Sequence, residues 1–218
     1  LVIIQIKQAI VIRYLTYRNR IENIYMNLNI QNSKSRKQLI TRINECFLFS
    51  DKFQYLGIAG WETLGAREHS EMWKIISENK NKEIIFYLLN PDTIVVDPIR
   101  RNLTILQARI EDLNVSRHSS VTEREYKDWI CTTIEVIKEL NRSREEKFKI
   151  KYCLYDEKPF WRCYLFPTKI FFTYYQAQIH GHHSTTYQIS KRNDELNTIH
   201  YVFDQYLRYL YYKYPPRY

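Results

Sequence analysis

An uninterrupted apolar run near the middle of the chain limits the folds that this sequence can adopt. The segment Glu83-Ile-Ile-Phe-Tyr-Leu-Leu-Asn-Pro91 has the length of a strand rather than a helix, and its apolar residues do not alternate with polar ones. Such a strand is typical of a sheet that is covered on both faces. Pro91 lacks the backbone N–H that a sheet ladder needs, so it ends the strand. The run therefore predicts an α/β fold with helices on both sides of the sheet.

Segments of strand period and helix period alternate on either side of this run. Short apolar stretches predict strands, and apolar residues three and four apart predict amphipathic helices. The predicted strands are 53–60, 149–154, 160–166 and 169–175, and the predicted helices are 35–47, 69–80, 96–113, 122–141 and 193–212. Thr122-Glu-Arg-Glu125 has the capping-box pattern of a helix start. This order predicts a mixed sheet flanked by helices, in one domain over residues 35–218.

The amino-terminal residues predict a separate helical arm over 1–34. Apolar residues recur at helical spacing from Leu1 to about residue 30, and the stretch 29–36 is polar and turn-like. Lys7 and Arg13 interrupt the apolar stretch, so it falls short of the roughly 18 uncharged residues of a membrane span. We therefore expect a cytoplasmic protein without a membrane span, whose residues 1–30 attach it to a protein partner or to a second copy.

The balance of charge favours an anionic partner. The chain has a formal net charge of +9 and a pI of about 9.3, with Arg and Lys interleaved among 19 tyrosines. Such a balance is typical of proteins that bind nucleic acid or another phosphate-bearing ligand, although it also keeps a protein soluble. The candidate contacts to phosphate are Arg67, Arg100, Arg101, Arg162, Lys169, His180, His182, His183 and Ser184.

Cysteine and glycine usage argues against the common cofactor sites. None of the 4 cysteines forms a C-x-x-C pair, so we expect free, buried thiols and no zinc site. Gly57-Ile-Ala-Gly60 and Gly65 match neither a P-loop nor the G-x-G-x-x-G pattern of a dinucleotide site. These glycines allow either a backbone approach to phosphate or close packing of a strand against a helix. The sequence therefore predicts no cofactor and no bound metal.

Histidines between the predicted strand 169–175 and the last helix are the weak candidates for catalysis. His180 and His182 are two residues apart, so on a strand they would share a face and reach one metal ion together. Glu62 and Asp92 follow two predicted strands and are the candidate carboxylates for the same site. Two other interpretations remain for the loop at 180–185: it contacts phosphate through Ser184, or it is an exposed loop with incidental histidines.

The region from Gln38 to Tyr211 resembles the phospholipase D-like fold in the arrangement of its elements. A helix precedes the strand Tyr55-Leu-Gly-Ile-Ala-Gly60, and a second helix precedes the strand at 83–92. The paired strands 160–166 and 169–175 come next, followed by a loop rich in Gly, Ser and Thr and by a closing helix. The resemblance implies a phospholipase D-like α/β domain.

The catalytic pair of that family is missing from this sequence. Active members carry His-x-Lys on the first of the paired strands, whereas this chain reads Trp161-Arg-Cys-Tyr-Leu165. Arg162 and Tyr164 therefore stand where the family's His and Lys are expected. Gly181 and Ser184 are compatible with the Gly-Ser that follows downstream in the family. The resemblance implies a relative without the catalytic motif, of the kind found in bacterial regulatory and defence proteins.

The leading functional prediction is a non-catalytic binding or sensor module that recognises nucleic acid or another phosphate-bearing ligand. One alternative is a metal-dependent nuclease or phosphodiesterase that uses His180 and His182. The other alternative is a subunit of a larger complex, assembled through the amino-terminal helix. The missing catalytic pair and the charge of +9 favour the first of these.

Overall fold

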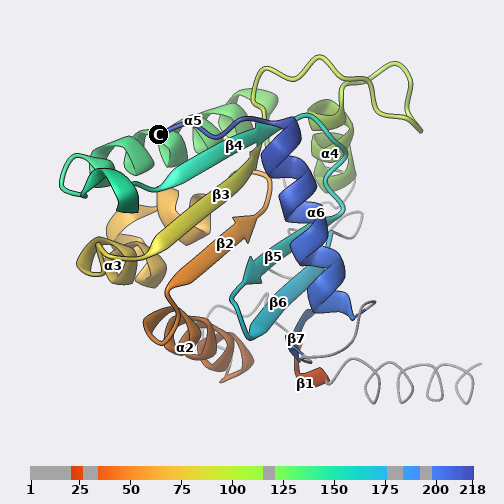
Figure 1. The fold of residues 1–218 in the computed structure, drawn as a ribbon. Coiled ribbons are helices and arrows are strands. Elements are labelled where there is room, and N and C mark those ends of the chain that lie inside the picture. The colour runs from red at the N-terminus through yellow and green to blue at the C-terminus, as the bar shows by residue number, and fades with distance from the viewer. Residues whose placement is uncertain (1–20, 27–33, 115–120, 176–183, 192–197) are drawn as a thin grey trace, which may run out of the picture.

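The described residues build a seven-stranded mixed sheet with helices on both faces (Figure 1). The computed structural model describes residues 21–26, 34–114, 121–175, 184–191 and 198–218. Its strands are β1 (Ile21–Tyr25), β2 (Lys52–Leu56), β3 (Glu83–Leu89), β4 (Lys151–Tyr155), β5 (Trp161–Leu165), β6 (Lys169–Tyr174) and β7 (Thr186–Ser190). The order across the sheet is β1-β7-β6-β5-β2-β3-β4. Strands β2, β3 and β4 are parallel, whereas the pairs β2–β5, β5–β6, β6–β7 and β1–β7 are antiparallel.

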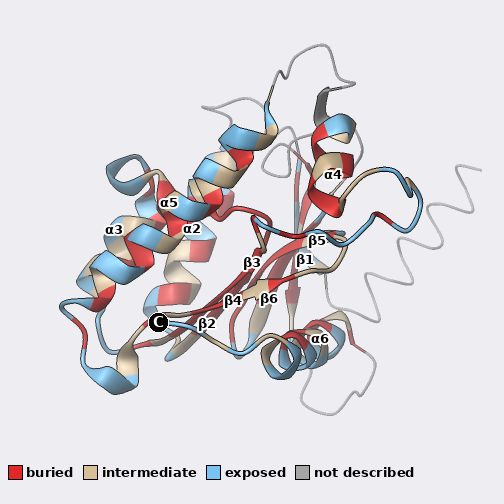
Figure 2. Cartoon of the chain, turned by 90° about the horizontal axis from the view of Figure 1, so that it is seen from above, coloured by how far each residue is buried: buried red, intermediate tan, exposed pale blue. Residues whose placement is uncertain are grey.

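Two layers of helices enclose the sheet (Figure 2). The helices are α2 (Lys34–Leu48), α3 (Glu71–Glu78), α4 (Ile105–Asn114), α5 (Glu123–Asn141) and α6 (Ile199–Lys213). Short helical turns lie at Trp61–Gly65, Arg67–His69 and Glu146–Phe148. Helices α2, α3 and α5 cover one face and α6 covers the other. The predicted α/β class with a mixed sheet is confirmed.

The central strand has the environment that its apolar run predicts. Strand β3 lies between β2 and β4, and its residues from Ile84 to Leu89 are buried. Helix α5 begins with the predicted capping box, in which Thr122 and Glu125 exchange hydrogen bonds between side chain and backbone. Of the cysteines, Cys153 and Cys163 are buried free thiols as predicted, whereas Cys131 is a free but exposed thiol.

The helix predicted over 96–113 begins only at Ile105, because an acidic residue holds the preceding segment in a turn. Asp97 accepts hydrogen bonds from the backbone N–H groups of Ile99 and Arg100, both at 2.8 Å, and lies 2.6 Å from Lys158 Nζ. Burial alone would raise the pKa of Asp97, but Lys158 and these N–H groups lower it below its usual value. The segment before α4 is therefore a loop, and the ion pair between Asp97 and Lys158 holds it beside the β4–β5 connection.

The helix predicted through residue 30 is wrong at Ile21–Tyr25, which form the edge strand β1. This strand pairs with β7, which the sequence patterns did not predict. The Tyr25 hydroxyl donates to Gln188 at 2.7 Å, and Glu22 accepts hydrogen bonds from Lys169 and Ser190. Polar cross-strand bonds of this kind are visible only once the strands are paired. The rest of the predicted arm, at 1–20 and 27–33, lies outside the described residues. Across the described part of the chain, no helix combines the length and the apolar content that crossing a bilayer requires.

Candidate anion-binding cleft

Strand β5 directs a basic and an aromatic side chain toward the layer of α2 and α5. Successive side chains of a strand point to opposite faces, so Arg162 and Tyr164 share one face and Trp161 takes the other. Trp161 packs against Phe203 of α6, with ring centroids 5.7 Å apart. Tyr164 packs against Tyr55 of β2, with centroids 5.3 Å apart. Arg162 therefore lies on the side of the sheet that α2, α3 and α5 cover.

Two adjoining cavities, of about 330 and 240 Å³, open beside Arg162. Residues that line both are Trp61, Glu62, Thr63 and Arg162. Helix α2 and the start of α3 complete the larger cavity, and α5 completes the smaller one with Tyr126 and Trp129. We call the combined space the Arg162 cleft. It lies where β2 ends, at the carboxyl edge of the parallel strands, where ligands of such sheets commonly bind.

Arg162 is buried and forms no ion pair with a carboxylate in the described part of the chain. The residue is 8 % exposed, and its buried Nε has no hydrogen-bond partner among the described residues. The guanidinium lies 5.8 Å from the centroid of the Tyr164 ring. Burial lowers the pKa of Arg162, but Tyr164, Tyr55, Tyr175 and Glu62 raise it, with a net shift above the ordinary value. The group is therefore positively charged in a place where water is largely excluded.

Tyrosine and threonine hydroxyls surround this guanidinium. The hydroxyls of Thr63 and Tyr164 are hydrogen-bonded at 3.1 Å, and the Tyr175 hydroxyl accepts the N–H of Ile58 at 3.3 Å. Burial raises the pKa of Tyr55 and Tyr175 far above the usual value, so both hydroxyls keep the proton that they can donate to an anion.

A glycine fixes the position of one of these hydroxyls. A Cβ atom on Gly57 would lie 2.2 Å from the Tyr55 hydroxyl oxygen, so a larger residue would displace the ring. Gly60 has a φ of 65°, in the left-handed region, and starts the turn Trp61–Gly65. A Cβ atom on Gly60 would lie 3.1 Å from Thr133 Cγ2 of α5. The structure thus favours close packing, rather than phosphate binding, as the role of these glycines.

A carboxylate lies at the mouth of the cleft. Glu62 is 3.6 Å from Arg36 of α2, and its side chain is 41 % exposed. Partial removal from water raises the pKa of Glu62, while Arg162 and Arg36 act in the opposite direction. The predicted partner Asp92 is exposed and lines neither cavity, so the structure does not unite these two acids in the cleft.

Aromatic rings form one wall of the cleft. Trp61 and Trp129 are stacked, with ring centroids 6.2 Å apart and an interplanar angle of 27°. Tyr126 extends this wall, since its ring lies 5.0 Å from that of Trp129. Trp61 and Trp129 are partly exposed, so they offer ring surface to a bound molecule. In the sequence Trp129 is one of the apolar residues at helical spacing in the predicted helix 122–141, and only the fold places it against Trp61.

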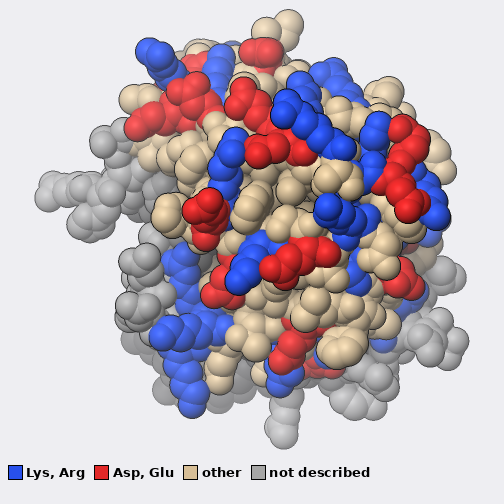
Figure 3. Space-filling model, turned by 90° about the vertical axis from the view of Figure 1, so that its left-hand side faces the viewer, with Lys and Arg blue, Asp and Glu red and all other residues tan. Residues whose placement is uncertain are grey.

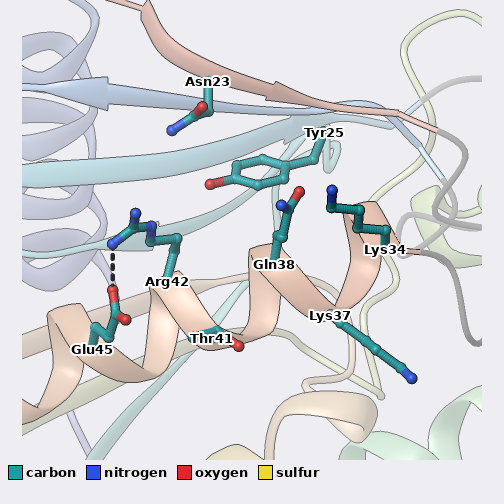
Figure 4. A pocket seen from close by; sticks show the side chains of 8 residues that line it. All are labelled: Asn23, Tyr25, Lys34, Lys37, Gln38, Thr41, Arg42 and Glu45. Carbon is teal, nitrogen blue, oxygen red and sulfur yellow. Dashed lines mark hydrogen bonds and ion pairs between the residues drawn. The ribbon is translucent and has the colours of Figure 1, made fainter.

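A separate polar groove of about 590 Å³ lies between β1 and α2 (Figure 4). Its lining residues are Asn23, Tyr25, Lys34, Lys37, Gln38, Thr41, Arg42 and Glu45. Arg42 pairs with Glu45 at 2.7 Å, and the Lys37 side chain points away from Tyr25. The basic residues of this groove are exposed, in contrast to Arg162.

Most of the other described candidates for phosphate contact are ion-paired at the surface. Arg67 lies 3.1 Å from Glu139, Lys169 lies 2.8 Å from Glu22, and Arg100 pairs with Asp112 and Glu111. Arg101 is exposed, and Ser184 is buried. On the side at the left of Figure 1, Figure 3 shows acidic and basic side chains intermixed rather than a single basic patch. Among the described candidates, Arg162 therefore stands apart.

The histidine candidates lie outside the described residues. These are His180, His182 and His183, so the predicted convergence of His180 and His182 on a metal stays a prediction. Within the ranges that the structure describes, no three side chains of His, Cys, Asp and Glu are grouped to hold a metal ion.

Comparison with known proteins gives little similarity. No family model and no curated protein matches the chain. A solved structure that it resembles is that of TrmBL2, an archaeal chromatin protein described as showing a novel mode of DNA binding, with a TM-score of 0.43 and 10% sequence identity. The match covers 88% of this chain and 52% of that chain, so this chain spans about half of that protein's length. A similarity at this level carries no argument about fold or function, and the phospholipase D-like resemblance stays a prediction.

Proposed function

We propose that this protein binds a phosphate-bearing ligand in the Arg162 cleft and acts as a binding or sensor module. The observation that carries the proposal is the buried guanidinium of Arg162, which forms no ion pair with a carboxylate of the described residues and has Glu62 as its nearby acid in the cleft. A charge that is removed from water is costly unless an opposite charge or hydrogen bonds compensate it. A phosphate group supplies both, since its oxygens match the planar fork of guanidinium donors. The neutral hydroxyls of Tyr55 and Tyr175 supply further donors.

This proposal predicts a large effect on binding and a small one on stability. Arg162→Met should weaken the binding of inorganic phosphate and pyrophosphate at least 10-fold, because a charge-assisted contact is lost. The same change should alter the free energy of unfolding by less than about 2 kcal/mol, because it breaks no ion pair with a described residue. Isothermal titration calorimetry measures the first quantity, and urea unfolding without ligand measures the second.

Arg101→Met is the matched control for this experiment. It removes an arginine that is exposed, so neither affinity nor stability should change. Unaltered affinity of the Arg162→Met protein for both anions would contradict the proposal. So would a loss of stability of more than about 2 kcal/mol without ligand, since that would mark Arg162 as a structural residue.

The amino-terminal half of α2 supports nucleic acid as a second candidate partner. Lys34, Arg36 and Lys37 lie in this half, and the first helical turn has no acidic residue. Positive charges near a helix amino terminus interact unfavourably with the helix dipole. A bound anion would offset this repulsion. A bound nucleic acid would extend from the polar groove to the Arg162 cleft, because residues of α2 line both.

Salt dependence of oligonucleotide binding tests this second candidate. For single- and double-stranded oligonucleotides, Lys34→Gln combined with Lys37→Gln should reduce the slope of log affinity against log salt by about 1.5 to 2. The control combines Lys74→Gln and Lys138→Gln, two exposed lysines on α3 and α5, and should leave the slope unchanged. An absence of oligonucleotide binding by the unmodified protein at low salt excludes nucleic acid as the partner.

A further inference from the structure

We infer that the ligand of the Arg162 cleft is a nucleoside monophosphate. This inference rests on the proposed function, because it takes the phosphate of the ligand to lie on Arg162. It goes further in assigning the other walls of the cleft to a base and a ribose. The cleft joins a buried cation, an exposed carboxylate and an aromatic wall within the same set of lining residues.

The aromatic wall is suited to a flat ring. Trp61 and Trp129 line the smaller cavity together with Arg162, and Tyr126 lines it beside them. The two indoles are in contact at 6.2 Å between centroids, so a base would stack on their combined surface rather than enter between them. Stacking on aromatic side chains tolerates any base, because every base has a π face. The wall therefore indicates a nucleotide without selecting one base.

The carboxylate is suited to ribose hydroxyls. Glu62 is shared by both cavities and lies between the aromatic wall and Arg36. An ionised carboxylate only accepts hydrogen bonds, so it is a poor neighbour for phosphate and a good acceptor for two vicinal hydroxyls. Its pairing with Arg36 leaves Arg162 as the cation of the cleft for the anionic group. One such guanidinium fits a single phosphate better than a di- or triphosphate.

The cleft is larger than a free phosphate ion, which would leave most of it empty. Together the two cavities offer several hundred Å³, and drug-sized ligands occupy sites of about 300 to 1,000 Å³. A sugar phosphate would satisfy Arg162 and Glu62 but would leave most of the aromatic wall uncovered. The comparison of sugar phosphate with nucleotide is therefore the decisive one.

The experiment measures the affinities of AMP, GMP, CMP, UMP, ribose 5-phosphate and adenosine for the full chain by calorimetry. We expect the monophosphates to bind at least 10-fold more tightly than ribose 5-phosphate and adenosine. Trp129→Leu should weaken all four monophosphates about 10-fold, in line with the loss of one stacking contact, and should leave ribose 5-phosphate unchanged. Trp129→Tyr keeps a flat ring and should restore most of the affinity. Arg162→Met should weaken monophosphates and ribose 5-phosphate alike.

Two further comparisons separate a local effect from a general one. Trp73→Leu removes a partly buried indole that lines neither cavity, so it should not change nucleotide affinity. The preference for AMP over 2′,3′-dideoxy-AMP should disappear in Glu62→Leu, because leucine has no acceptor for the ribose hydroxyls and the ratio cancels the effect of the changed charge. A preserved ratio removes Glu62 from ribose recognition and contradicts that part of the inference.

The outcomes distinguish this inference from the proposed function. Equal affinity for AMP and ribose 5-phosphate, with Trp129→Leu and Trp129→Tyr both without effect, overturns the nucleotide while Arg162→Met still supports phosphate binding. Equal affinity for adenosine and AMP overturns the assignment of the phosphate to Arg162. No binding of any phosphate compound overturns both proposals. Urea unfolding of each variant checks that the affinities are measured on folded protein.

Discussion

Replacing Arg144 by methionine is expected to lower the free energy of unfolding by about 3 kcal/mol. Arg144 follows α5 and is 7 % exposed. Its guanidinium donates to the backbone carbonyls of Asn79 and Lys80 at 3.1 and 3.0 Å, and to those of Ile76 and Phe148. Three of these carbonyls belong to the last turn of α3 and the residues just after it.

The expected loss arises because methionine leaves four backbone carbonyls without the donors of Arg144, one in a buried hydrogen bond and three in partly buried ones. The last carbonyls of a helix have no partner within the helix, and in α3 the carbonyl of Ile76 accepts from Arg144. Burial lowers the pKa of Arg144 to about 10, so the group remains charged at neutral pH and its hydrogen bonds are charge-assisted. Urea unfolding followed by circular dichroism measures the change, with an unaltered m-value as the test for two-state behaviour.

Arg142→Met is the control for Arg144→Met. Arg142 is exposed and lies two residues earlier, so the chemical change is the same but no buried carbonyl is uncovered. We expect its effect to stay within about 0.5 kcal/mol. Equal effects of the two substitutions would show that the buried contacts of Arg144 do not contribute to stability.

The two buried arginines should therefore behave differently. Arg144 has backbone carbonyls for its donors, whereas Arg162 has no hydrogen bond to a described residue at its Nε. Arg144→Met should therefore be clearly less stable than the unmodified protein, and Arg162→Met should differ from it much less. The contrast distinguishes an arginine that holds the fold together from one that is held ready for a ligand.

Replacing Phe53 by alanine is expected to lower the free energy of unfolding by about 4 kcal/mol. Phe53 is 1 % exposed and is the second residue of β2. Its ring lies 5.5 Å from that of Phe47 of α2, 6.0 Å from that of Phe86 of β3 and 5.2 Å from that of Phe166. The substitution leaves a cavity between sheet and helix and removes these aromatic contacts at once.

Phe49→Ala is the matched control for Phe53→Ala. Phe49 is 91 % exposed at the end of α2, so the same chemical change removes no buried surface. Its effect on the urea midpoint should be close to zero. Phe53→Leu fills most of the space and should lie between the two. A loss of less than about 1 kcal/mol for Phe53→Ala would contradict the packing described for this side of the sheet.

Phe53 also connects the core to the cleft. Its ring lies 6.3 Å from that of Tyr164, in a stacked arrangement. Tyr164 in turn packs against Tyr55 and is hydrogen-bonded to Thr63 of the cleft. The side chains of the cleft thus pack against the same aromatic core that stabilises the domain.

The sequence by itself determined the elements whose residues carry a local signal. The apolar run of β3, the capping box of α5 and the helical period of α2 depend on neighbours within one or two turns, so they were predictable. The edge strand β1 and its neighbour β7 were not, and Ile21–Tyr25 also fits a helical period. Their strand form depends on cross-strand bonds between residues more than a hundred positions apart, such as Tyr25 and Gln188.

The candidate site was also predictable from the sequence only in part. Composition predicted an anionic partner, and the sequence placed Arg162 and Glu62 among the candidates, but it ranked Arg162 with surface arginines that the fold pairs with acids. The burial of Arg162 is a property of tertiary structure, and so is the lack of an ion pair between it and a described carboxylate, since both depend on what α2, α5 and the turn Trp61–Gly65 place around β5. The amino-acid sequence determined the net charge of the chain, and packing decided that Arg162 is a buried cation that lines the cleft.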